Sequence, residues 1–243
     1  MKKQTLLISG AILLLTVGIF TACKKSSSEE SKDPVAFYSK KFMKDETFLT
    51  FFKTMVTNSF KLNKLAGNDR ANATQRTTMI NISDTTAAYD YVSETVTAEV
   101  LMKAENPGFF ELTLSQQTEV MNAVCNNLAV ESYRQANATT PLVVFATETL
   151  DYLNTNGPML RGQLAINITW GEFAMCTAGA LGAALAEYGG IIGQVWNLLS
   201  QGSQFLTWGG VFQIVKTVVR NAVPWYKVAS VAIGYATCLW AAA

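Results

Sequence analysis

The chain has 243 residues, of which 49% are hydrophobic and 15% are charged. A charged fraction this far below the usual value of about 25% excludes a protein that is disordered as a whole and predicts a large core. The 19 basic and 18 acidic residues nearly cancel, so charge gives no basis for binding nucleic acid. The sequence has no histidine, which excludes Ser-His-Asp and Cys-His catalytic groups and every zinc site that contains histidine.

The N-terminal 22 residues have the organisation of an export signal. A short basic segment precedes an apolar run over residues 6–20, and two small residues separate this run from Cys23. The run is shorter than the roughly 20 residues that a membrane span needs. We therefore expect a cleaved signal peptide over residues 1–22, with an uncleaved anchor as the alternative.

The last residues of this segment, Phe20-Thr21-Ala22-Cys23, resemble a bacterial lipobox. The motif departs from the common form at Phe20, where leucine is usual, and is similar in this respect to the lipoboxes of Bacteroidota lipoproteins. The resemblance implies that Cys23 is lipidated and anchors the chain to a membrane, because two or more acyl chains on one residue hold a protein stably at a bilayer. Since Lys24 follows the cysteine, the family's sorting rules imply an outer-membrane lipoprotein that faces the periplasm or the cell surface.

Residues 23–33 are expected to form a flexible tether. The segment Lys24–Asp33 reads KKSSSEESKD and has no apolar side chain that could offset the entropy of ordering. We expect a single helical domain over residues 34–243.

Helix start and stop signals recur along this domain, whereas the alternating pattern of strands is scarce. Expected starts are the N-caps and capping boxes at Asp33-Pro34, Asp45, Asp84, Thr113 with Gln116, Thr140-Pro141, and Thr169 with Glu172. Expected ends are Gly67, Asn106-Pro107-Gly108 and Asn156-Gly157-Pro158. Residues 68–83 are expected to form a loop, and short apolar runs at 79–82 and 142–145 leave a strand open as an alternative. The fold class is therefore mainly α, a multi-helix globular domain.

The C-terminal third, residues 169–243, differs from the rest in having five charged residues in 75 positions. It is rich in Gly and Ala, and Gly189-Gly190 predicts a break, because glycine costs about 1 kcal/mol against alanine within a helix. Three shorter helices are expected to follow, over residues 191–200, 208–223 and from 224 to the end. We expect this region to form the centre of the core, with membrane insertion as the alternative, since 28 residues from Tyr188 onward carry no charge.

The same third is similar in amino-acid composition to the Gly- and Ala-rich helices of class II-type and circular bacteriocins, with Lys216, Arg220 and Lys227 as its cationic residues. The similarity implies a segment that acts on membranes. Its net charge of only +1 is low for a helix that attacks a membrane.

Three cysteines remain beyond position 23, namely Cys125, Cys176 and Cys238. In an oxidising compartment one disulfide and one free thiol are the simple expectation, and a Cys176–Cys238 bond would enclose the apolar third. Three reduced, buried cysteines are the alternative. No CxxC pair is present, which argues against redox catalysis and against a thiolate zinc site.

Glu187 is isolated in an apolar segment and is expected to form a buried ion pair with Lys216 or Arg220. The sequence contains no nucleotide-binding or esterase motif, so we expect no enzyme activity, no cofactor and no metal. The predicted function is a lipid-anchored protein of the cell envelope with a binding or structural role. The alternative is a membrane-active, bacteriocin-like effector, or its envelope partner, that acts through residues 169–243.

Overall fold

The computed structural model describes residues 33–67, 82–137, 139–156, 167–202, 207–221 and 224–242. Ten helices occupy these ranges, and the described residues contain no strand. The predicted mainly helical fold is thereby confirmed, and the run at 142–145 lies in a helix. The export signal, Cys23, the tether up to residue 32 and most of the expected loop at 68–83 lie outside the described residues.

The helices of the described residues range in length from five residues to 33. Their bounds, in chain order, are α2 (Pro34–Phe42), α3 (Glu46–Leu65), α4 (Thr85–Glu105), α5 (Pro107–Glu111), α6 (Leu114–Ala129), α7 (Glu131–Ala136), α8 (Pro141–Asn156), α9 (Trp170–Gly202), α10 (Trp208–Asn221) and α11 (Trp225–Ala242).

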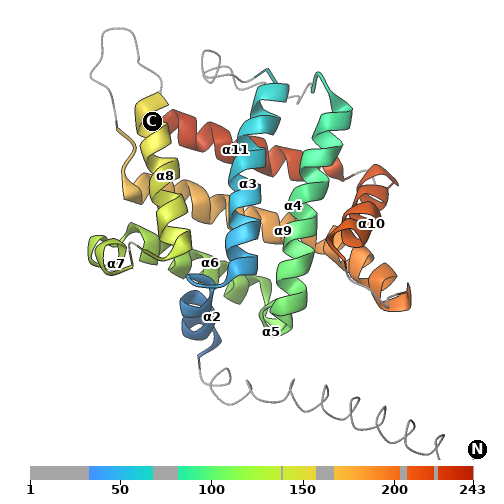
Figure 1. Ribbon diagram of the computed structural model, residues 1–243, viewed down its shortest axis with the longest axis horizontal. Coiled ribbons are helices and arrows are strands. Elements are labelled where there is room, and N and C mark those ends of the chain that lie inside the picture. The colour runs from blue at the N-terminus through green and yellow to red at the C-terminus, as the bar shows by residue number, and fades with distance from the viewer. Residues whose placement is uncertain are drawn as a thin grey trace, which may run out of the picture.

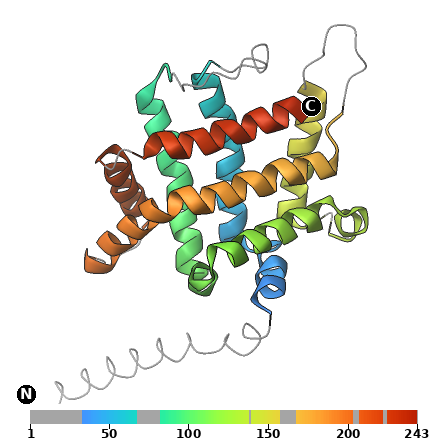
Figure 2. The ribbon, with the colours of Figure 1, turned by 180° about the vertical axis from the view of Figure 1, so that it is seen from behind.

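The larger helices form two layers whose helices run across each other. One layer holds α8, α3 and α4, which stand upright in Figure 1. The other holds α11, α9 and α6, which lie across the first layer and are seen in front in Figure 2. Helix α9 lies between α6 and α11 and packs against both, while α10 packs at one edge against α4 and α9. One hydrophobic cluster takes side chains from both layers.

Most helices begin where the capping residues predict. The carboxylate of Asp45 accepts a hydrogen bond from the backbone N–H of Phe48 at 2.8 Å, and Asp33 and Asp84 cap α2 and α4 in the same way. Both predicted capping boxes are present, at the starts of α6 and α9. Gly67 follows α3 with a φ of 72°, the left-handed conformation that glycine adopts without a steric penalty.

The predicted break at Gly189-Gly190 is wrong, because α9 continues through both residues to Gly202. The side chains of Tyr188, Ile191 and Ile192 beside the glycines are at most 2% exposed. Burying these large groups is worth more than the roughly 1 kcal/mol that each glycine costs. Tertiary packing therefore stabilises the helix across two residues of low helix propensity.

Two further boundaries were not predicted. The stop signal at residues 106–108 ends α4, but Pro107 also begins the short helix α5. Val130 then interrupts the helix expected to continue from Thr113, so that α6 and α7 are separate.

An aromatic cluster joins the first described helix to the rest of the fold. Phe42 of α2 stacks on Phe48 of α3 with ring centroids 4.6 Å apart, and its edge meets Phe109 of α5 at 4.9 Å. All three side chains are fully buried. The aromatic cluster thus fixes α2 to α3 and α5.

Helix α9 is long and apolar enough to cross a membrane, and it is the one such helix among the described residues. Half of its most apolar window is buried within the domain. Phe173, Leu181 and Tyr188 have no exposed surface. In this structure α9 therefore has the position of a core helix.

Candidate binding groove and buried carboxyl group

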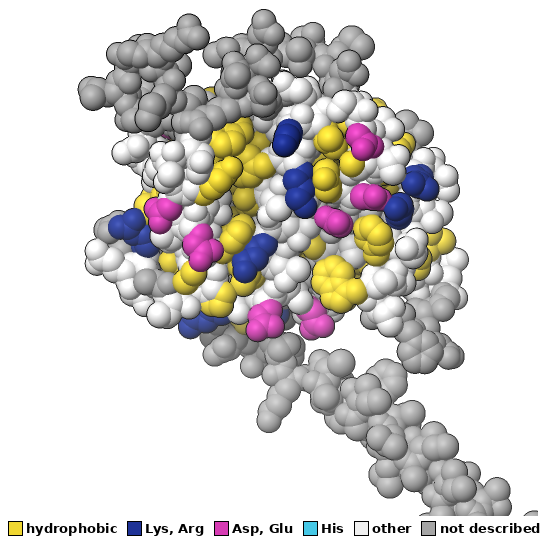
Figure 3. Space-filling view, turned by 45° about the horizontal axis from the view of Figure 1, so that its top comes forward, with side chains coloured by type: hydrophobic (Ala, Val, Ile, Leu, Met, Phe, Trp, Pro, Cys, Tyr) yellow, Lys and Arg dark blue, Asp and Glu magenta, His cyan; other side chains and the backbone are white. Residues whose placement is uncertain are grey.

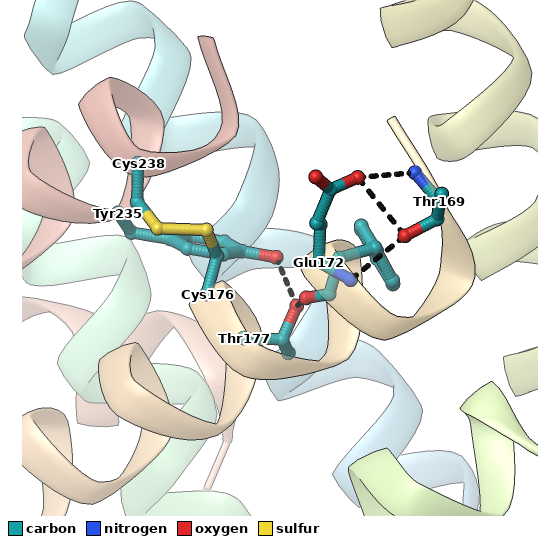
Figure 4. The surroundings of a disulfide bond; sticks show 7 residues. Thr169, Glu172, Cys176, Thr177, Tyr235 and Cys238 are labelled. Atoms are coloured by element: carbon teal, nitrogen blue, oxygen red, sulfur yellow. Dashed lines mark hydrogen bonds between the residues drawn. A yellow bond between two sulfur atoms is a disulfide. The ribbon is translucent and has the colours of Figure 1, made fainter. Parts of the chain in front are cut away.

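Cys176 of α9 and Cys238 of α11 are joined as a disulfide, with Cα atoms 5.8 Å apart and 62 positions between them in sequence. The bond links two neighbouring helices of one layer (Figure 4). Beside it the hydroxyl groups of Thr177 and Tyr235 are 2.8 Å apart and share a hydrogen bond. Of the two cysteine arrangements left open by the sequence, the structure has the disulfide.

Cys125 is the free cysteine among the described residues, and it is buried. Burial raises the pKa of its thiol from 9.0 to about 12. The thiolate is the reactive form, so this side chain acts as a small hydrophobic group of the core.

The predicted buried ion pair of Glu187 with Lys216 or Arg220 is wrong. Glu187 instead lies 3.6 Å from Lys227 of α11, and the two side chains are 39% and 52% exposed. Lys216 pairs with Asp90 of α4 at 2.6 Å, and Arg220 is exposed. The cause is the side-by-side packing of α9 and α11, which brings Glu187 to the solvent-accessible start of α11. Exposed pairs of this kind contribute about 0–1 kcal/mol.

The carboxyl group that is buried is Glu99 of α4, with no exposed surface. Neither of its carboxyl oxygens has a hydrogen-bond partner. Burial raises the pKa of Glu99 well above its ordinary value, and the positive charge of Lys103 only partly opposes this. Burial therefore favours the neutral, protonated form of Glu99.

The hydroxyl group of Tyr188 on α9 is similarly buried and has no hydrogen-bond partner. Its pKa is raised by burial and, to a smaller extent, by the neighbouring Glu99. The two groups come from helices that pack together in the fold. Together they place two buried side chains without hydrogen-bond partners in the interior of the domain.

Sequence reasoning missed Glu99 because α4 carries other acidic residues as well, and acidic residues usually lie on solvated helix faces. The signal was the composition of α4, in which apolar residues occupy every face. Besides the adjoining α5, the helices α3, α9, α10 and α11 all pack against α4. A helix enclosed in this way must bury whatever polar residues it carries.

The other buried polar residues of α4 are satisfied within the helix. Ser93, Thr95 and Thr97 each donate a hydrogen bond to the carbonyl oxygen four residues earlier, at 2.6–2.9 Å. Glu99 makes no such bond, although a protonated carboxyl group has an O–H donor. The contrast leaves Glu99 as the buried residue of this helix whose side chain has no hydrogen-bond partner.

A groove of about 410 Å³ opens between α3, α4 and α10. Its lining residues are Thr54, Glu94, Thr97, Trp208, Gly209 and Phe212. Apolar surface dominates, and the side chain of Trp208 is 55% exposed. The volume and this mixture of aromatic and few polar groups are typical of sites for small molecules.

The carboxylate of Glu94 in this groove is positioned from the interior. Asn58 of α3 is 2% exposed and donates hydrogen bonds to the carbonyl oxygen of Tyr91 at 3.0 Å and to Oε2 of Glu94 at 3.1 Å. The buried amide of Asn58, held by its hydrogen bond to Tyr91, thus orients the exposed carboxylate of Glu94. Figure 3 shows hydrophobic side chains lying between charged groups of both signs on one face of the molecule.

Among the described residues, no group of three or more cysteine and acidic side chains could hold a metal ion. Glu99 has no solvent-exposed surface, so a substrate in solution does not reach it in this conformation. What the described arrangement can do is bind a small molecule in the groove beside α10.

No known protein-family model matches the chain. No curated protein and no solved structure is significantly similar to it.

Proposed function

We propose that this chain is a lipid-anchored protein of the bacterial cell envelope and that its helical domain binds a ligand outside the cytosol. The lipobox-like residues at 20–23 support the anchor. The groove between α3, α4 and α10 supports the binding role.

The observation that carries the placement is the disulfide between Cys176 and Cys238. Disulfides form and persist in oxidising compartments and are rare in the cytosol. The bond lies more than 150 residues from the export signal, so it supports export independently of the lipobox.

The tether limits how far the domain can be from the membrane. Residues 23–33 precede α2 directly, and 11 residues extend at most about 40 Å. Because α2 is fixed to the domain by the aromatic cluster around Phe42, the start of the domain would stay within about 40 Å of the surface to which Cys23 is attached.

Binding is preferred to catalysis because the described residues offer no reactive pair. Glu99 is enclosed, Glu94 stands in the groove without a second titratable group in its lining, and Cys125 is buried as a thiol. Catalysis needs an acid, base or nucleophile that is within reach of substrate.

The experiment is Cys23→Ser in the full chain, expressed in a bacterium that processes lipoproteins. We expect the wild type to incorporate labelled palmitate and to fractionate with the outer membrane, and the variant to do neither. Because Cys125 is buried, thiol labelling of the unfolded, non-reduced chain should find it as the one free thiol of the mature domain. Palmitate labelling and fractionation that do not change with the substitution would refute the anchor.

Insertion into a membrane is the second candidate function, and the length and apolarity of α9 favour it. To insert, α9 would have to leave α6 and separate from α11, to which Cys176 is bonded. Dye release from anionic lipid vesicles, measured with and without a reductant, tests this function. Release that rises on reduction would support it, and intact vesicles under both conditions would count against it.

A further inference from the structure

We propose that the groove between α3, α4 and α10 binds an organic ammonium ion that carries a small apolar group. This inference rests on the proposed binding function and names the chemical class of its ligand. It combines the aromatic side chains of α10 with the carboxylate of Glu94 on α4.

The charge of the groove selects a cation. Glu94 is the only ionisable residue among the described residues that line it. The hydrogen bond from Asn58 occupies Oε2 of Glu94. Its other oxygen, Oε1, can accept a hydrogen bond from the positive group of a ligand or contact that group. Asn58 is itself fixed by Tyr91, so the carboxylate is oriented before a ligand arrives, and less entropy is lost on binding.

The aromatic residues supply the second half of the recognition. Trp208 and Phe212 lie four positions apart on α10, hence on one face of the helix, and both line the groove. The face of an aromatic ring attracts a cation, most strongly for tryptophan, and aromatic residues with a carboxylate suit alkylated ammonium groups that water solvates weakly. The apolar lining then accommodates the ligand's alkyl groups.

Lys216 does not cancel this preference. Its ammonium group lies 5.7 Å from the ring centre of Phe212 but is paired with Asp90 at 2.6 Å. The backbone N–H groups at the start of α10 carry partial positive charge. One of them, the N–H of Gly210, donates a hydrogen bond to the side chain of Thr207 at 3.2 Å. Lys216 and this N–H group therefore already have acceptors within the protein.

The test uses the full chain in a maltoside detergent, with choline as the probe. Equilibrium dialysis with labelled choline should show saturable binding at one site per chain. The uncharged isostere 3,3-dimethylbutan-1-ol has the same shape without the charge, and we expect it to compete at least ten-fold less well. The proposal is overturned if choline does not saturate a site or if the neutral alcohol competes equally.

Two variants and two matched controls locate the site. Trp208→Ala and Glu94→Gln should each weaken choline binding about ten-fold, whereas the exposed residues Tyr226 and Glu111, changed by Y226A and E111Q, should leave it unchanged. Circular dichroism checks that each variant is folded. Equal losses in variants and controls would show that choline binds elsewhere and would overturn the proposal.

This experiment and the test of the anchor fail independently. Choline binding without palmitate on Cys23 would remove the proposed placement and keep the ligand class. Palmitate labelling without choline binding would keep the anchored protein and remove the ligand class.

Discussion

Replacement of Glu99 by glutamine should stabilise the protein, and the gain should grow as the pH rises. Burial holds the folded-state pKa of Glu99 well above its ordinary value of 4.5. Below pH 4.5 the carboxyl group is protonated in both the folded and the unfolded chain, so ionisation of Glu99 then costs the folded state no stability. Above this pH the unfolded chain loses the proton while the folded chain retains it, and stability is lost until the pH passes the folded-state pKa.

The size of the effect follows from the slope of this linkage. Each pH unit within the window costs the wild type about 1.4 kcal/mol, and Glu99→Gln avoids this cost because an amide does not ionise. Between the ordinary pKa of 4.5 and the raised pKa of the folded chain, the variant should therefore gain up to about 1.4 kcal/mol on the wild type for each pH unit. In a domain of this size a gain of 1.4 kcal/mol corresponds to about 3–6 °C in Tm.

The assay is urea unfolding followed by circular dichroism at pH 4.5, 5.5 and 6.5, with the disulfide intact. The charged and titratable groups that interact with Glu99 in the structure are Lys103 and Tyr188. Glu111→Gln, on the exposed end of α5, is the matched control and should show no such slope. A stability difference between E99Q and wild type that is flat with pH would refute the reasoning.

Three further predictions concern stability. Gly189→Ala should add about 0.5–1 kcal/mol to the free energy of unfolding in urea, because a new methyl group meets no atom within 4 Å; a loss would show that the helix needs glycine there. Phe42→Ala should cost about 3–5 kcal/mol by the same measurement, since it empties the centre of the aromatic cluster; a cost below 1 kcal/mol would show that α2 is not firmly packed. Cys176→Ser should lower stability by about 4 kcal/mol through the loss of a 62-residue loop closure, and an unchanged Tm under reducing and non-reducing conditions would contradict this.

Much of the fold was predictable because its signals are local. An aspartate N-cap such as Asp45 and a capping box such as Thr113 with Gln116 act within one turn, so their residues carry the whole interaction. Gly67 is equally local, since its positive φ depends on its own missing side chain. These positions were correctly assigned from the sequence alone.

The candidate groove was not predicted, because its walls come from three helices far apart in the chain. Thr54 and Glu94 are separated by 40 positions, and Trp208 lies more than 100 positions further on. Trp208 lies within the uncharged run of residues 188–215, where an aromatic residue is expected in a core. Only the packing of α10 against α4 leaves its side chain exposed beside a carboxylate.

The amino-acid sequence by itself determined the helical class, most helix starts and the pair of cysteines able to enclose the apolar third, because backbone capping and residue composition act over short distances. The tertiary structure decided which charged groups meet and which are buried. Glu187, isolated among apolar neighbours, lies at the surface beside Lys227, whereas Glu99, within an acidic stretch, is enclosed next to Tyr188. The reason is that burial depends on how many helices surround a position, and that number is set by the packing of the two layers.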